Sequence, residues 1–136
     1  MSQAKPLYRI VDANFNRAKE GLRVCEDVSR YVWNRPTLTK SFKGLRHDLT
    51  QVATGLGMLK ILEGRDVASD VGRPSSESEL KRKDIPSVFL ANMQRVKESL
   101  RVLEEISKLL DQKVSEGFKN LRYKAYVLEQ KAVKRS

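Results

Sequence analysis

Two stretches of this chain are near-copies of each other. Residues 13–30 read ANFNRAKEGLRVCEDVSR, and residues 91–108 read ANMQRVKESLRVLEEISK. Ten of the 18 aligned positions are identical, at an offset of 78 residues. A second match follows each copy, because FKGLRH at 42–47 aligns with FKNLRY at 118–123 at an offset of 76. Two matches in the same order indicate an internal duplication.

Apolar residues in these stretches recur every three or four positions, which is typical of amphipathic helices. The sequence predicts main helices at about 11–33, from 37 or 39 to the glycines at 55 and 57, at 86–110 and at 114–132, with a short helical turn at 58–62. The apolar face predicted for the first helix comprises Ile10, Ala13, Ala18, Gly21, Leu22, Val24, Cys25, Val28 and Val32. The seams predicted for the second and fourth helices comprise Leu38, Phe42, Leu45, Leu49 and Val52, and Val114, Phe118, Leu121, Ala125, Leu128 and Ala132.

These elements predict an all-α, four-helix-bundle-like domain over residues 1–136. It is built from two duplicated helical hairpins, at about 10–57 and 87–132, joined by a polar loop at about 64–84 that has no repeat counterpart. Within that loop, the serine- and glutamate-rich stretch 75–79 is interpreted as a charged linker.

The composition of the chain excludes several kinds of site and favours certain ligands. The chain has one cysteine and one histidine, which excludes an intrachain disulfide and a Cys/His zinc cluster. It has no apolar run long enough to span a membrane and no apolar signal core, so we expect a cytoplasmic protein without a membrane partner. The net charge of +10 suits nucleic acid, anionic lipid or small phosphorylated ligands, and a solvated basic surface is the alternative interpretation. Nucleic acid is the weaker candidate, because the basic residues are not interleaved with exposed aromatic residues.

Polar residues recur at equivalent places in both copies. Asn14 falls in the middle of the predicted apolar face, and Arg17 lies at its edge. An amide and a guanidinium aimed at a core need partners. One interpretation is a structural hydrogen-bond network across the pseudo-twofold axis. The other is a pocket between the two halves. The residues of this pattern are Asn14, Arg17, Glu20 and Arg23 in the first copy, and Asn92, Arg95, Glu98 and Arg101 in the second.

The polar loop is the best candidate for a catalytic segment. Arg65-Asp66 and Asp70-Val71-Gly72-Arg73 place two carboxylates four residues apart, flanked by arginines. Carboxylates can hold Mg²⁺, arginines match phosphate oxygens, and Gly72 allows a close approach of the backbone to a ligand. A charged linker is the alternative interpretation. His47 is either an acid–base group or a structural residue, and Cys25 is expected in the core. Neither a G-x-x-x-x-G-K-[ST] loop nor a G-x-G-x-x-G turn is present.

The ordered motifs at 12–27, 45–47, 65–72 and 91–105 resemble a known family, over about residues 9–128. It is the helical domain often fused in front of thiamine-phosphate synthase in bacteria, assigned as a second, non-ribokinase type of hydroxymethylpyrimidine phosphate kinase. The resemblance implies phosphorylation of 4-amino-5-hydroxymethyl-2-methylpyrimidine phosphate with ATP and Mg²⁺. The synthase barrel itself is missing from this chain. We therefore expect the domain to act alone or beside a separately encoded synthase.

On this resemblance, Asp66, Asp70 and Arg65 are expected at the catalytic centre, with Asp70 and Asp66 as the Mg²⁺ ligands. The expected substrate- and phosphate-binding residues are Asn14, Arg17, Glu20, Arg23, Arg46, His47, Gly72, Asn92, Arg95, Glu98 and Arg101. Two other functions stay open. The chain could be a non-catalytic docking or oligomerisation domain for a thiamine-phosphate synthase, as the seams on the second and fourth helices suggest, and a homodimer is compatible with this. A basic nucleic-acid-binding module ranks last.

Overall fold

The structure is a computed structural model that describes residues 4–73 and 81–134. Across these ranges it is all-α and contains no strand, which confirms the predicted fold class. The helices are α1 (Ala4–Asp27), η1 (Val28–Val32), α2 (Pro36–Thr54), α3 (Met58–Glu63), α5 (Ile85–Ser107) and α6 (Gln112–Val133). The serine- and glutamate-rich stretch 75–79, interpreted above as a linker, lies outside the described residues.

The first helix differs from its prediction at both ends. It begins at Ala4, seven residues earlier than predicted, and after Asp27 it continues as the π-helical turn η1. A π-turn holds more residues per turn than an α-helix, so side chains beyond it rotate off the apolar face. Val32, the last residue of this turn, is 49% exposed. Ile10, near the other end of the helix, is 37% exposed, so the prediction that both residues belong to the buried face is wrong. Near the N-terminal end of α1, the buried side chains are those of Val11 and Phe15.

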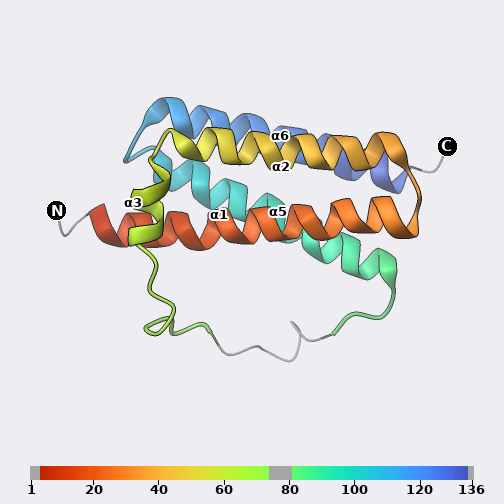
Figure 1. The fold of residues 1–136 in the computed structure, drawn as a ribbon, viewed down its shortest axis with the longest axis horizontal. Coiled ribbons are helices and arrows are strands. Elements are labelled where there is room, and N and C mark those ends of the chain that lie inside the picture. The colour runs from red at the N-terminus through yellow and green to blue at the C-terminus, as the bar shows by residue number, and fades with distance from the viewer. Residues whose placement is uncertain (1–3, 74–80, 135–136) are drawn as a thin grey trace.

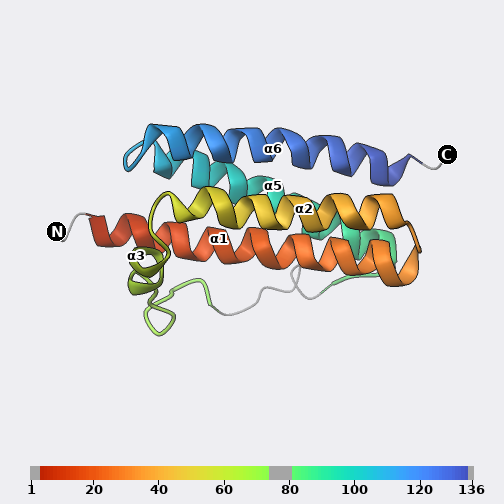
Figure 2. The ribbon, with the colours of Figure 1, turned by 45° about the horizontal axis from the view of Figure 1, so that its top comes forward.

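The four long helices form a bundle in which neighbours run antiparallel (Figure 1). α1 packs against α2 and α5, and α6 packs against the same two helices from the other side (Figure 2). The bundle order is thus α1, α2, α6, α5. In it α2 and α5 occupy opposite corners and point the same way, so the chain must travel back along the bundle between them. The short helix α3 lies across the start of α1, and the segment after it begins that return (Figure 1).

Both predicted seams are buried between the helices. Leu38, Phe42, Leu45 and Leu49 of α2 are at most 5% exposed, and all six seam residues of α6 are buried. Phe89 of α5 adds an aromatic contact, with its ring centroid 5.8 Å from that of Phe42. The apolar stripes that suggested a docking role therefore form the core of the bundle rather than its surface.

The duplication extends to one buried ion pair in each hairpin. Arg46 Nε lies 2.9 Å from Glu26 Oε1, and Arg122 Nε lies 2.9 Å from Glu104 Oε1. The pairs occupy equivalent positions, since 26 + 78 = 104 and 46 + 76 = 122. Each pair joins the two helices of its own hairpin, so these ion pairs form no network across the pseudo-twofold axis.

The two repeated asparagines also bond within their own helices. Asn14 Nδ2 donates to the carbonyl of Ile10 at 2.9 Å, and Asn92 Nδ2 donates to the carbonyl of Val88 at 2.8 Å. Each amide therefore satisfies its donor on the preceding turn and leaves its oxygen available. In the described part of the chain, no helix is both long and apolar enough to cross a membrane.

Candidate functional site

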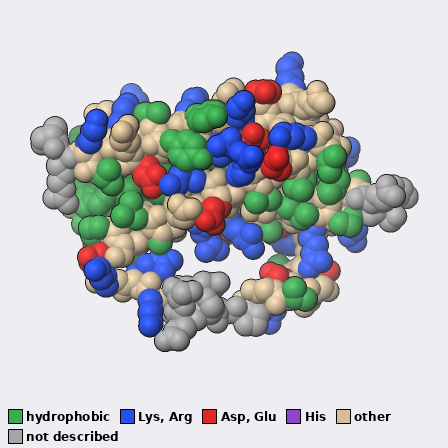
Figure 3. All heavy atoms as spheres, turned by 180° about the vertical axis from the view of Figure 1, so that it is seen from behind, with side chains coloured by type: hydrophobic (Ala, Val, Ile, Leu, Met, Phe, Trp, Pro, Cys, Tyr) green, Lys and Arg blue, Asp and Glu red, His purple; other side chains and the backbone are tan. Residues whose placement is uncertain are grey.

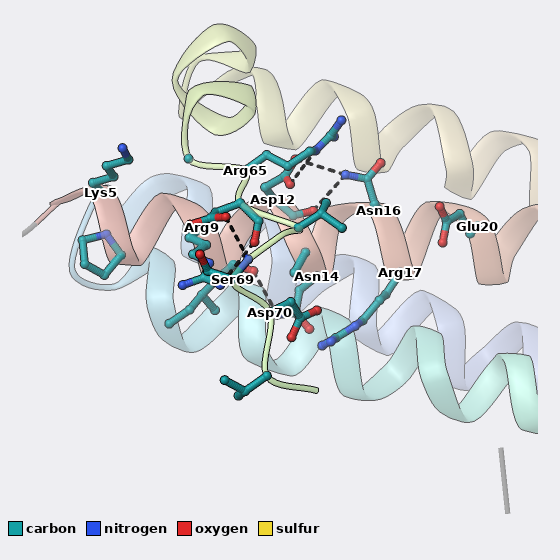
Figure 4. Close-up of a pocket in the computed structure, with 17 residues that line it drawn as sticks. Lys5, Arg9, Asp12, Asn14, Asn16, Arg17, Glu20, Arg65, Ser69 and Asp70 are labelled. Atoms are coloured by element: carbon teal, nitrogen blue, oxygen red, sulfur yellow. Dashed lines mark hydrogen bonds and ion pairs between the residues drawn. The ribbon is translucent and has the colours of Figure 1, made fainter. Parts of the chain in front are cut away.

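A groove of about 970 Å³ lies between the first half of α1 and the segment 64–71 (hereafter the insert segment) that follows α3 (Figure 4). One wall is the α1 face that carries Asn14 and Arg17. The other wall carries Asp66 and Asp70. The structure thus brings together the duplicated polar residues of the first copy and the carboxylates of the unduplicated loop.

Three contacts attach the insert segment to α1. Gly64 packs so closely that a Cβ there would lie 2.7 Å from the carbonyl carbon of Tyr8, which explains a glycine at this position. Arg65 forms two hydrogen bonds with the carboxylate of Asp12, both 2.9 Å long. Arg9 Nη2 donates to the carbonyl of Asp66 at 3.2 Å. These contacts hold the segment along one face of α1 and define the groove.

Arg17 is a cation of the groove that has no partner among the described residues. Its side chain is exposed, and it forms no ion pair or hydrogen bond within the part of the chain that the structure describes. Figure 4 shows it reaching from α1 toward Asp70. Lys5 and Arg9 add two further positive charges at the other end of the groove. An unpaired guanidinium beside a concave surface is suited to bidentate contact with phosphate.

The two carboxylates of the insert segment order their own loop. Asp66 Oδ1 accepts from the backbone N–H of Ser69 at 3.1 Å, and Asp70 Oδ1 accepts from that of Gly72 at 2.9 Å. The hydrogen bonds from Ser69 hold the pKa of Asp66 below its ordinary value.

Each carboxylate keeps an oxygen free of these loop hydrogen bonds. Among the described residues, no group of three or more His, Cys, Asp or Glu side chains could hold a metal ion. The residues therefore fit Mg²⁺ only in its common arrangement of one or two carboxylates with the remaining ligands from substrate phosphates and water.

The other residues predicted for the site lie elsewhere. Arg46 is committed to the buried pair with Glu26, so it is a structural cation rather than a free phosphate ligand. Arg23 pairs with Asp27 on the surface at 3.5 Å. His47 is exposed on α2, outside the groove, and Gly72 lies just beyond its lining.

The second-copy residues do not line the groove either. Asn92, Arg95, Glu98 and Arg101 belong to α5, and Glu98 accepts a hydrogen bond from Gln94 at 2.9 Å. Glu20, by contrast, is at the groove, as predicted for the first copy.

Figure 3 shows the face behind the view of Figure 1, where Lys and Arg side chains alternate with carboxylates over the bundle.

Sequence reasoning missed three residues of the groove that matter chemically. Lys5 and Arg9 were overlooked because the first helix was predicted to begin near residue 11. Their i, i+4 spacing, continued at Asp12 and Asn16, would have placed all four on one helical face. The partnership of Asp12 with Arg65 had no signal in the sequence, since 53 residues separate them.

The chain is similar in sequence to several proteins named thiamine-phosphate synthase. A thiamine-phosphate synthase of Nostoc punctiforme is 40% identical over 124 residues, which are 90% of this chain and 34% of that protein. One from Thermosynechococcus vestitus is 40% identical over 130 residues, 95% of this chain and 36% of that protein. One from Rhodopirellula baltica is 36% identical over 126 residues, 92% of this chain and 34% of that protein.

The chain thus spans about a third of the length of the curated relatives it matches. No solved structure matches it at a significant level. The model of the ThiD2 family matches residues 9–131, which cover most of the bundle and all of the groove lining except Lys5 and Pro6. This chain belongs to the ThiD2 family.

Proposed function

We propose that this protein is a phosphomethylpyrimidine kinase of thiamine biosynthesis, which transfers a phosphoryl group from ATP to 4-amino-5-hydroxymethyl-2-methylpyrimidine phosphate. The reaction would take place in the groove between α1 and the insert segment. The pathway is supported by relatives named thiamine-phosphate synthase. The reaction itself is supported by the chemistry of the groove.

The observation that carries the proposal is the unpaired guanidinium of Arg17 opposite the carboxylate of Asp70 (Figure 4). Phosphoryl transfer requires little covalent chemistry from a protein, and catalysis rests on positioning and on neutralising phosphate charge. Arg17, Arg9 and Lys5 supply that positive charge along one wall of the groove.

The remaining polar groups suit the pyrimidine and its hydroxymethyl group. The amide oxygen of Asn14 is not used by its bond to Ile10, so it can accept from the exocyclic amine. Asp70 can accept the proton of the attacking hydroxymethyl oxygen through the oxygen that does not bond Gly72. Bound Mg²⁺ would offset the charge of the ATP phosphates. Asp66 would hold it where Asp70 accepts this proton, and Asp70 is the alternative ligand.

A coupled assay of the purified protein with ATP, Mg²⁺ and the pyrimidine monophosphate tests the proposal. We expect the diphosphate product, and we expect Arg17→Ala to lower kcat/KM by about 10- to 150-fold, the loss for a hydrogen bond to a charged group. The equivalent variant of the second copy, Arg95→Ala, should lower it by less than about threefold, the size of an exposed charge effect. Asp70→Asn should abolish turnover while the helical circular dichroism spectrum is retained.

Two outcomes would reject this function. One is a wild-type protein that forms no diphosphate under conditions in which a known kinase does. The other is equal sensitivity to Arg17→Ala and Arg95→Ala, since only Arg17 lines the groove.

A second candidate is a docking role toward thiamine-phosphate synthase, and one observation favours it. A shallow groove between α2 and α6 is lined by Gly44, Tyr123 and Val127, of which Tyr123 is 52% and Val127 49% exposed. About two thirds of the length of the Nostoc punctiforme relative, which is named a synthase, lies outside the matched region, and we propose that a synthase polypeptide of this kind occupies this face. Titration of a purified synthase against the wild type and Tyr123→Glu tests this. No binding at micromolar concentration, or equal binding by both proteins, would reject it.

A further inference from the structure

We infer that Asp12 and Arg65 are positioning residues, which clamp the insert segment onto α1 and confine the ligand site to the first repeat. The inference rests on the proposed function for its ligand. It assigns Arg65 a different task from the catalytic one that the sequence suggested, because Arg65 acts through the loop rather than on the substrate.

The geometry of the contact is that of a bidentate clamp. Arg65 Nε lies 2.9 Å from Asp12 Oδ2, and Arg65 Nη2 lies 2.9 Å from Asp12 Oδ1. Two parallel N–H···O bonds fix the guanidinium plane as well as its distance. The hydrogen bonds to Asp12 raise the pKa of Arg65 above its ordinary value. The Nε–H and one N–H of Nη2 are thus committed to Asp12, and the carboxylate fixes the orientation of this guanidinium.

Asp12 is itself held in place. Its side chain is 8% exposed, whereas that of Arg65 is 44% exposed, so the carboxylate is the fixed member of the pair. Asn16 Nδ2 donates both to the backbone carbonyl and to Oδ1 of Asp12, at 2.9 and 3.1 Å. Loss of Arg65 would leave a nearly buried carboxylate with only this neutral donor, which is unfavourable.

The second repeat lacks the clamp. The position equivalent to Asp12 is Leu90, since 12 + 78 = 90, and Leu90 is 44% exposed on α5. The position equivalent to Asn16 is Gln94, which donates to Glu98 instead. Although Asn14 and Arg17 are duplicated, the residue that can anchor a loop above them is not. One site per chain follows from this difference.

Hydrogen exchange of the backbone amides in the insert segment measures the clamp directly. We expect Arg65→Ala and Asp12→Asn each to speed exchange at residues 65–70 by about tenfold or more, because the segment would open locally. Exchange in the double variant should be little faster than in either single variant, since both substitutions remove the same contact. Arg65→Lys keeps the positive charge but loses the two-pronged hydrogen bonding of the guanidinium. Its exchange rate should therefore lie between those of the wild type and Arg65→Ala.

A ligand readout separates positioning from a general structural role. Inorganic pyrophosphate, titrated by calorimetry, should bind Arg65→Ala about tenfold more weakly than the wild type, while the melting temperature changes by only a few degrees. With the kinase assay, the same variant should raise KM more than it lowers kcat. Lys108→Ala, which breaks an exposed ion pair of α5 with Glu105, is the control and should alter none of these values.

The outcomes are distinct. Unchanged exchange at residues 65–70 in both single variants would overturn the clamp, whatever the ligand does. Loss of kcat in Arg65→Ala with unchanged exchange and KM would make Arg65 a catalytic residue instead. A wild type that neither binds pyrophosphate nor phosphorylates the pyrimidine would refute the proposed function, and the exchange experiment would still decide the clamp.

Discussion

The α1–α2 hairpin and the α5–α6 hairpin share a scaffold but differ in chemistry. Both bury an arginine–glutamate pair with an Nε–Oε1 distance of 2.9 Å, and both carry the Asn-x-x-Arg-x-x-Glu pattern on the first helix. Only the first hairpin has an acidic anchor for the insert segment, and only its asparagine and arginine line a groove.

The difference teaches that repeated residues need not make repeated sites. Duplicated buried residues are retained because each hairpin needs the same internal packing. Asn14 and Arg17 line a groove because the insert segment covers the α1 face that carries them. In a bundle with one crossover connection that segment can cover only one copy, so the symmetry ends there.

In the comparison of the two hairpins, the largest expected effect is that of breaking a buried ion pair. Arg122→Ala is expected to reduce the free energy of unfolding by about 3–5 kcal/mol, because it leaves Glu104 buried without its partner. Arg122 also donates from Nη1 to the hydroxyl of Tyr126 at 3.1 Å, which adds to the loss. Arg46→Ala should cost less, since the Arg46 side chain is 17% exposed against 9% for Arg122. Urea denaturation measures both.

The replacement of both charged partners is the control for that experiment. Arg122→Met combined with Glu104→Leu should recover most of the stability, because no uncompensated charge remains. Equal losses for Arg46→Ala and Arg122→Ala would show that burial does not set the difference between the hairpins.

A smaller effect is expected at the crossing of α1 and α5. Gly21 corresponds to Ser99, yet a Cβ at Gly21 would lie 2.8 Å from Val96 Cγ2 and 3.1 Å from the carbonyl oxygen of Asn92. Gly21→Ala should therefore destabilise the protein by about 1–2 kcal/mol, the overpacking cost reduced by the better helix propensity of alanine. Thermal unfolding checks this, and a stabilised variant would contradict the tight crossing.

The opposite sign is expected at a glycine in open space. Gly44 lies in the middle of α2 and corresponds to Asn120. A Cβ added at Gly44 would have no neighbouring heavy atom within 4 Å. Gly44→Ala should raise the free energy of unfolding by about 0.5–1 kcal/mol, because alanine loses less backbone entropy in a helix. The pair Gly21→Ala and Gly44→Ala thus forms a matched test, and the same sign for both would contradict the packing described.

The smallest effect concerns pH and the start of α5. The side-chain and backbone hydrogen bonds from Ser87 hold the pKa of Asp84 below its ordinary value of 3.8. A lowered pKa means that this cap stabilises the fold at neutral pH and that its contribution is lost as the pH falls below about 4 through the folded pKa. Asp84→Asn should remove this part of the acid dependence, measured as unfolding free energy between pH 2 and 7. An unchanged profile would exclude the cap as its source.

The sequence by itself determined the helical class, the duplication and the buried seams. Periodic apolar residues fix which face of a helix is buried, and the offset of 78 identifies equivalent positions such as Glu26 and Glu104. Asn14, Arg17 and Asp70, which the sequence had singled out separately, line one groove in the structure. Their roles in phosphoryl transfer stay predictions.

Tertiary structure alone decided which partners the charged residues take. Arg46 and Arg65 are indistinguishable from Arg17 in a linear sequence, yet the first two pair with Glu26 and Asp12 and the third stays unpaired. Helical periodicity carries no information about contacts across 20 or 53 residues. The first contact depends on the packing of α2 against α1 and the second on the path of the chain after α3, because only the folded backbone brings a long charged side chain within hydrogen-bonding distance of its partner.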